Sequence, residues 1–221
     1  MHAMPIEHPP RRRAVLMAAA ATALAGPALA SSRRALAEMT EGPFYPPRAW
    51  REAWPDQDAD LSRVRIGEQL LQAQGEHLGI ELVVADTAGR LIDQAEIEIW
   101  QCDALAHYRH PRVKAEPGRF DPGFQGFGAT RSGAQGQARL RTIKPVPYPG
   151  RTPHIHFKLR HASFGELTSQ LFVSADPGNE GDFLWRRLKT ADRAGLTMAL
   201  QPATLDNGLR WMARHTLVVP A

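Results

Sequence analysis

The chain has 221 residues, of which 43% are hydrophobic, so it can bury the core of one ordinary domain and is not disordered as a whole. Its formal net charge is +4, and its basic residues are scattered rather than striped, which argues against a nucleic-acid partner. Cys102 is the only cysteine, so no internal disulfide can form, and we expect it to be a small buried residue.

The first thirty residues have the pattern of an export signal. Three arginines at 11–13 precede an apolar run at 14–29, which is too short to span a bilayer comfortably and ends in a small-x-small motif at 28–30. We predict a signal peptide over 1–30. The arginine pair at 12–13 resembles the twin-arginine signal of folded, cofactor-containing proteins, so we expect a periplasmic protein with no membrane partner in its mature form. Cleavage would change 27 basic and 23 acidic residues to 24 and 22.

Prolines at 43, 46, 47 and 55 predict an N-terminal arm over 31–75, with a short helix near 68–74. From 76 to 221, short apolar runs separated by turns predict an all-β domain, a sandwich or barrel of antiparallel strands. The expected strands lie at 80–85, 95–100, 123–130, 137–143, 154–160, 168–173 and 215–219, and a short helix is expected at 182–188. The glycine-bearing segment 132–136 predicts a hairpin loop between 123–130 and 137–143.

His154 and His156 are the most informative pair in the chain. Side chains alternate along a strand, so these two share one face with Cα atoms about 6.5–7 Å apart, a spacing that suits metal chelation. Ile155, Phe157 and Leu159 then face the core. Structural histidines remain an alternative, since a zinc site needs a third ligand and a ferrous two-histidine site needs a carboxylate. Residues 157–163 contain no acid, and Glu166 is poorly placed to supply one.

The three tyrosines bear on the choice of metal. Tyr148 lies on a proline-stiffened loop six residues before His154, Tyr108 follows the expected strand at 95–100, and Tyr45 lies in the arm. Phenolates are hard anionic ligands that favour ferric over ferrous iron. Two phenolates and two imidazoles would cancel two of the three charges of ferric iron, and a hydroxide would cancel the third.

Three further runs accompany the His-Ile-His motif. They are Thr-Glu-Gly-Pro-Phe-Tyr-Pro at 40–46, Glu-Ile-Trp-Gln-Cys-Asp at 98–103 and Arg-Thr-Ile-Lys-Pro-Val-Pro-Tyr at 141–148. Together, over about residues 38–175, they resemble the intradiol ring-cleavage dioxygenases, most closely the iron-binding subunits of the protocatechuate 3,4-dioxygenase branch. The resemblance implies that 76–221 forms an antiparallel β-sandwich with long loops.

The resemblance also implies a site. Tyr108, Tyr148, His154 and His156 would bind non-haem Fe(III), and Tyr148 would leave the metal as a catechol binds. Arg151 would stabilise charge developing on the substrate. Gln170 and Tyr45 would contact the substrate, although a backbone hydrogen bond for Gln170 and a packing role for Tyr45 are alternatives. His107 and His110 match no ligand position in the family and are expected behind the ligands or at the surface.

The implied partners are a small aromatic diol and O2, and family members assemble as multimers, so we expect a homo-oligomer. Gly150 departs from the family, which often has a bulky aromatic residue there, and this difference predicts a reshaped pocket. Two other functions stay open at this point. One is a non-catalytic β-sandwich binding module, and the other is a zinc-dependent hydrolase that uses His154 and His156.

Overall fold

The computed structural model describes residues 33–54, 56–113, 119–204 and 207–221. They belong to a compact unit that begins at Ser31, and the predicted signal peptide at 1–30 lies outside the described residues. No helix within these ranges combines the length and apolar character needed to cross a bilayer.

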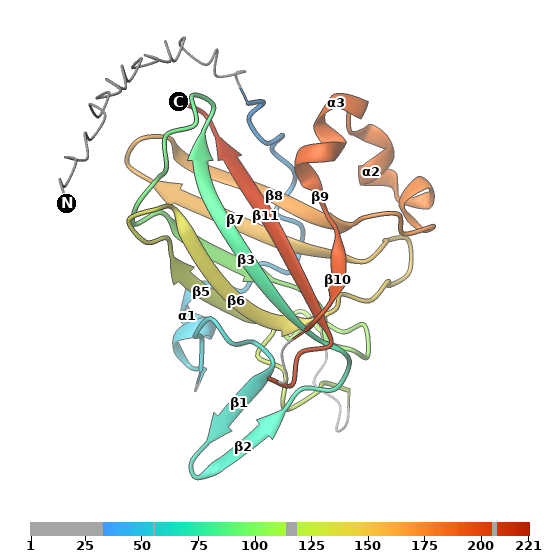
Figure 1. Ribbon diagram of the computed structural model, residues 1–221. Helices are drawn as coiled ribbons and strands as arrows, with labels where there is room; N and C mark the ends of the chain where they lie inside the picture. The colour runs from blue at the N-terminus through green and yellow to red at the C-terminus, as the bar shows by residue number, and fades with distance from the viewer. Residues whose placement is uncertain (1–32, 55, 114–118, 205–206) are drawn as a thin grey trace, which may run out of the picture. The chain divides into compact units, whose positions relative to one another are not determined.

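Two β-sheets form the body of this unit (Figure 1). The first sheet has the strand order β10 (Leu200–Pro202), β11 (Trp211–Val219), β3 (His77–Asp86) and β6 (Gln137–Ile143). The second has the order β5 (Phe127–Arg131), β4 (Glu96–Trp100), β7 (His154–His161), β8 (Gly165–Val173) and β9 (Thr197–Met198). Apolar side chains from both sheets merge into one buried cluster, which is the arrangement of a β-sandwich. The predicted fold class is confirmed.

The strand β7 lies in the middle of the second sheet and is buried on both faces. Ile155, Phe157 and Leu159 are each 0% exposed and point into the core between the sheets, as the alternation predicts. His154 and His156 lie on the opposite face and are 2% and 3% exposed. The N-terminal arm covers part of that face, since Glu41 pairs with Lys158 and the Thr40 carbonyl accepts from Gln170 Nε2 at 3.2 Å.

Two expectations about strand pairing are wrong. The segment 132–136 does not close a hairpin, because β5 and β6 belong to different sheets. Its first residue, Ser132, is buried and anchors the crossing, accepting from Ala95 N at 2.9 Å and donating to the Ile92 carbonyl at 2.7 Å. The sheets are also not wholly antiparallel, because β11 pairs with β3, and β9 with β8, in parallel.

The expected helix near 68–74 is also wrong. Residues 63–72 form a small antiparallel hairpin of β1 (Arg63–Ile66) and β2 (Gln69–Gln72), separate from the main sheets (Figure 1). Gly67 adopts φ 59°, a left-handed value that suits a two-residue hairpin turn and interrupts a helix.

The helices are short. The helix α1 (Arg48–Glu52) lies in the arm, and the predicted helix at 182–188 is confirmed as α2 (Phe183–Arg187). It is followed by α3 (Thr190–Arg193), and single 3₁₀ turns occur at Asn179–Gly181 and Ala194–Leu196.

Candidate metal centre

Two histidines and two tyrosines meet beside β7. The ring centroids of His154 and His156 are 4.9 Å apart, and those of Tyr148 and His154 are 5.5 Å apart. The ring of Tyr108 lies next to two of these rings, with its centroid 5.7 Å from that of Tyr148 and 6.1 Å from that of His156. Its hydroxyl oxygen lies 3.5 Å from His154 Nε2. Each predicted ligand therefore has two of the others as immediate neighbours.

A tight turn positions Tyr148. Pro149 and Gly150 occupy the central positions of the turn from Tyr148 to Arg151, which is closed by Arg151 N donating to the Tyr148 carbonyl at 2.8 Å. Gly150 has φ +81°, the left-handed value that a type II turn requires at that position, and proline suits the position before it. An added Cβ at Gly150 would meet no atom within 4 Å. The backbone conformation of the turn therefore favours glycine at this position, although there is space for a side chain.

Tyr108 is held by the loop after β4. Asp103 Oδ1 accepts from the backbone N–H groups of Leu105 and His107, both at 2.9 Å. The Phe44 ring from the arm stacks on Tyr108 with centroids 4.6 Å apart. His110 meets Phe44 edge-on at 5.8 Å, so it packs against the residue that stacks on Tyr108, which agrees with its expected place behind the ligands.

The two histidines are oriented differently. His154 Nδ1 donates to the Thr152 carbonyl at 2.6 Å, which leaves Nε2 as the nitrogen with a free lone pair. The His156 ring stacks on Trp100 with centroids 4.9 Å apart, and its Nδ1 is buried without a hydrogen-bond partner within the described ranges. Both imidazoles are thus fixed in place while retaining a nitrogen that is able to bind a metal.

Burial governs the protonation of all four side chains. It lowers the pKa of His154 to about 4 and the pKa of His156 well below 6.5, so both rings are neutral at physiological pH. Burial also raises the pKa of Tyr108, and that of Tyr148 despite the opposing effect of Arg151. A phenolate at buried Tyr108 and another at half-buried Tyr148 would therefore need a compensating cation between them. Neutral imidazoles and phenols that ionise on binding form a donor set that fits a trivalent metal.

Comparisons with known proteins agree with this donor set. A family described as "Dioxygenase" matches residues 41–213. The chain belongs to the intradiol dioxygenase family. The beta chain of protocatechuate 3,4-dioxygenase from Burkholderia cepacia is 32% identical over 161 residues, covering 69% of this chain and 66% of that protein. Hydroxyquinol 1,2-dioxygenase from Corynebacterium glutamicum is 29% identical over 137 residues, covering 53% of this chain and 43% of the relative.

A solved structure is similar along nearly its whole length. It is the dioxygenase domain of a dioxygenase carbohydrate-binding protein fusion from Streptomyces sp. SirexAA-E, with a TM-score of 0.61 and 25% identity. The match covers 85% of this chain and 99% of that domain. The matches to the two curated relatives therefore span two thirds or less of their lengths, whereas the likeness to this domain is nearly complete.

In this member of the intradiol dioxygenase family, the Arg151 side chain lies beside the predicted ligand Tyr148 and is 8% exposed. Its Nη1 is 3.4 Å from the Tyr148 hydroxyl, and its Nη2 donates to Gln170 Oε1 at 2.5 Å. Gln170 is the cross-strand partner of His156, and its Nε2 donates to the Thr40 carbonyl at 3.2 Å. Gln170 thus has a backbone partner, the expected alternative, and also links Arg151 to the arm. Its contact with a substrate stays a prediction.

Tyr45 contacts Trp100, and its hydroxyl binds residues outside the four predicted ligands. Its hydroxyl donates to Glu98 Oε2 at 2.7 Å and accepts from Arg160 Nη2 at 3.2 Å. Its ring packs edge-on against Trp100 at 4.9 Å. These contacts favour the packing alternative for Tyr45, and its contact with substrate stays a prediction.

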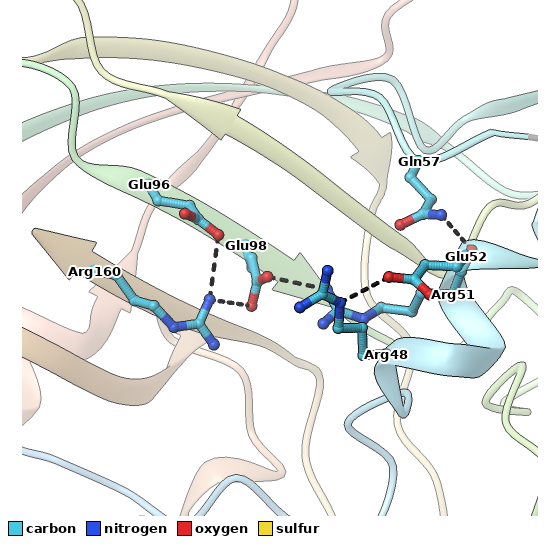
Figure 2. Close-up of a pocket in the computed structure, with 7 residues that line it drawn as sticks. All are labelled: Arg48, Arg51, Glu52, Gln57, Glu96, Glu98 and Arg160. Carbon is cyan, nitrogen blue, oxygen red and sulfur yellow. Dashed lines mark hydrogen bonds and ion pairs between the residues drawn. The ribbon is translucent and has the colours of Figure 1, made fainter.

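The acids near Tyr45 are already paired. Glu96 and Glu98 line a hollow of about 410 Å³, where both bind Arg160 and Glu98 also binds Arg51 (Figure 2). Glu166 pairs with Lys158 and Arg160, so it is not a ligand of the centre. Across the described ranges, no three His, Cys, Asp or Glu side chains gather in a metal-binding arrangement. The donors that lie beside the two histidines are therefore tyrosines. A zinc site would need a third nitrogen, sulfur or carboxylate donor, so this donor set does not favour the zinc alternative.

Cys102 is 1% exposed and packs with Trp100 and Tyr108. Burial raises the pKa of its thiol to about 12, so it is protonated at neutral pH. The expectation of a small buried cysteine is confirmed. The structure also assigns contacts to a residue that the sequence did not single out for the site, Asp182, which binds Arg151 Nε at 2.8 Å.

Proposed function

We propose that this protein is a non-haem Fe(III) intradiol dioxygenase that opens the ring of a catechol between its two hydroxyl-bearing carbons. Both atoms of O2 enter the product, a muconate-type dicarboxylic acid. The observation that carries the proposal is that the side chains of Tyr108, Tyr148, His154 and His156 meet beside β7. Family membership supports it, because the relatives named above are dioxygenases of protocatechuate and hydroxyquinol.

The chemistry divides between the metal and the chain. When bound, Fe(III) would orient the two catechol oxygens and make the ring carbon electron-rich enough to react with O2. The four side chains would supply two negative charges, which Tyr108 and Tyr148 acquire only by losing their protons. The buried, neutral imidazoles of His154 and His156 add donors without adding charge.

Tyr148 and Arg151 act on protons and charge. When Tyr148 is ionised, its phenolate oxygen can accept a proton from a catechol hydroxyl, and burial raises the pKa of Tyr148, which makes this phenolate a better proton acceptor. Arg151 Nη1, at 3.4 Å from that oxygen, places fixed positive charge beside the position where charge develops. Because only 8% of the Arg151 side chain is exposed, little water competes for its N–H groups.

We leave the substrate at the level of a catechol. Gly150 and Arg151 line a hollow of about 480 Å³ beside Tyr148, large enough for an aromatic ring with a substituent. No Cβ wall stands at Gly150, so this hollow supports a substrate that differs from the one typical of the family.

The pattern of the first thirty residues supports export to the periplasm by the twin-arginine route.

The test is oxygen uptake by the purified, iron-containing protein with catechol, protocatechuate, hydroxyquinol and larger catechols, with product mass measured under ¹⁸O2. We expect a ring-opened diacid that carries two labelled atoms. One labelled atom, or cleavage outside the two hydroxyls, would overturn the intradiol assignment. Zinc in place of iron with hydrolytic activity would support the hydrolase alternative, and iron without turnover of any catechol would support a binding module.

A further inference from the structure

The carboxylate of Asp182 is buried beside Arg151 and accepts four hydrogen bonds. Its side chain is 0% exposed. Oδ2 accepts from Arg151 Nε at 2.8 Å and from Thr152 N at 3.0 Å. Oδ1 accepts from the N–H groups of Leu184 at 2.8 Å and Trp185 at 3.0 Å, and so caps the helix α2. One side chain therefore ties α2 to the loop that leads into β7.

The first group that Asp182 holds is the guanidinium of Arg151. This guanidinium is planar, so anchoring two of its nitrogens fixes the third. Asp182 binds Nε and Gln170 binds Nη2 at 2.5 Å, which directs Nη1 toward the Tyr148 hydroxyl. Without Asp182, Arg151 would be a buried charge with no carboxylate partner at Nε.

The second group is the imidazole of His154. Asp182 fixes Thr152 by its backbone N–H, and the carbonyl of the same residue accepts from His154 Nδ1 at 2.6 Å. The Thr152 hydroxyl donates to Asn179 Oδ1 at 2.9 Å, and Asp176 Oδ1 lies 3.2 Å from the same hydroxyl oxygen. The segment before α2 thus fixes the loop that carries Arg151 and leads into His154 at the start of β7.

We propose that Asp182 is a positioning residue of the metal centre, which fixes both the guanidinium of Arg151 and, through Thr152, the ring of His154. The effect on turnover rests on the proposed function, whereas the effect on Arg151 itself does not. Asp182 does not touch the four ligand rings directly. It acts by orienting Arg151 and Thr152, which contact Tyr148 and His154.

Two variants of Asp182 separate positioning from folding. Asp182→Asn keeps a side-chain oxygen but replaces the other with an NH2 group, so the cap of α2 and the bond to Arg151 can no longer both be satisfied. Asp182→Ser keeps a good capping residue and removes the carboxylate altogether. The matched control is Asp86→Asn. Asp86 is also buried, binds an arginine (Arg90) and accepts from two backbone N–H groups, but it is the last residue of β3.

The kinetic test is a double-mutant cycle with Arg151→Met in the full-length, iron-loaded protein. We expect Asp182→Asn and Asp182→Ser to lower kcat/KM for the best catechol by about 10- to 100-fold, because small misplacements of a positioning group have effects of that size. In the Arg151→Met background either change should lower kcat/KM by less than it does in the wild type, because only the route through Thr152 and His154 remains. Asp86→Asn should stay within about twofold of wild type. Full multiplication of the Asp182 and Arg151 effects would overturn the proposal.

A second measurement does not depend on turnover. In NMR spectra of the full-length metal-free protein, the Arg151 Nε–H should be protected from exchange and identified by its loss in Arg151→Met. We expect the signal to disappear in both Asp182 variants and to persist in Asp86→Asn. Iron retention during dialysis against a chelator should also fall about 10- to 100-fold in the Asp182 variants, as when the hydrogen-bond partner of a metal-binding histidine is lost.

These readouts distinguish the two proposals. One outcome is that the Arg151 signal and iron retention change as expected while neither the wild type nor any variant turns over a catechol. In that case Asp182 positions the centre and the proposed reaction is wrong. If catechol is cleaved while the Arg151 signal survives in both Asp182 variants, the reaction stands and the positioning role is rejected. Loss of the signal in Asp86→Asn would also reject it, because the effect would then follow from general destabilisation.

Discussion

The Trp100 indole lies flat against the His156 imidazole, with ring centroids 4.9 Å apart and planes 12° from parallel. The two residues are direct cross-strand partners on β4 and β7. His156 has no partner at Nδ1 within the described residues, whereas His154 has the Thr152 carbonyl. The orientation of one histidine therefore depends on a hydrogen bond, and that of the other depends on stacking.

Replacing Trp100 should test this dependence. We expect Trp100→Leu to lower the free energy of unfolding by about 2–5 kcal/mol, as for other truncations in a core, and to lower iron retention because the His156 ring loses its flat support. Trp100→Phe keeps a flat ring, so it should retain more iron than Trp100→Leu even where the two variants have similar free energies of unfolding. Trp211→Phe, on the other sheet, is the control. Equal iron content in the leucine and phenylalanine variants would contradict the role of stacking.

The three tyrosines provide a spectroscopic test of the ligand set. The iron-loaded protein should be red-brown from phenolate-to-iron charge transfer, and Tyr148→Phe should change that absorption and lower turnover. Tyr108→Phe should change the absorption as well. Tyr45→Phe should leave it unchanged, because the Tyr45 hydroxyl binds Glu98 and Arg160 instead. A colourless native protein that contains no iron and retains full activity would contradict the assignment.

The turn at Gly150 predicts an unusual order of substitutions. Gly150→Ala should lower stability by about 1–2 kcal/mol, because a residue with a Cβ is strained at φ +81°. Gly150→Asn should be tolerated better, since asparagine adopts left-handed conformations more readily. Thermal unfolding and oxygen uptake would be measured for both. If side-chain volume were decisive instead, the larger asparagine would be the more harmful change.

His215, on β11 and away from the metal centre, makes stability depend on pH. Burial lowers its pKa below 6.5, although the Gly195 carbonyl opposes the shift. The unfolded chain therefore binds more protons than the folded one as the pH falls below about 6.5. Between pH 7.5 and 5.5 this residue should lower the free energy of unfolding by at most about 1.4 kcal/mol. Urea unfolding of His215→Gln should show a shallower pH dependence than wild type, and an unchanged slope would refute this origin.

Much of the site could be predicted because its information is local. The alternation in 154–160 indicated both the shared face of the two histidines and the core face of Ile155, Phe157 and Leu159, and burial confirms both. The prolines and glycine before β7 indicated a stiff loop that presents Tyr148. The likeness of the runs at 40–46, 98–103 and 141–148 to one family placed Tyr108 and Arg151 near the histidines.

The errors arose where partners are distant in the sequence. Apolar alternation marks a strand but does not say which sheet it joins, so β5 and β6 were expected to pair and do not. Residues 68–74 have good helix formers, yet Gly67 allows a hairpin whose strands stabilise each other. Asp182 was hidden for the same reason, because its acidic side chain acquires meaning only from Arg151, which lies 31 positions earlier in the sequence.

The parallel pairing of β11 with β3 sets an order for folding. The strand β11 is central in its sheet, between β10 and β3, yet β3 lies more than 120 residues earlier in the chain. Until β11 has been synthesised, β3 keeps one edge without a partner, and such an edge can pair with another chain. Contacts of such long range also slow folding. The last strand to be synthesised therefore closes the open edge of β3 in the completed chain, although it contributes no side chain to the candidate metal centre.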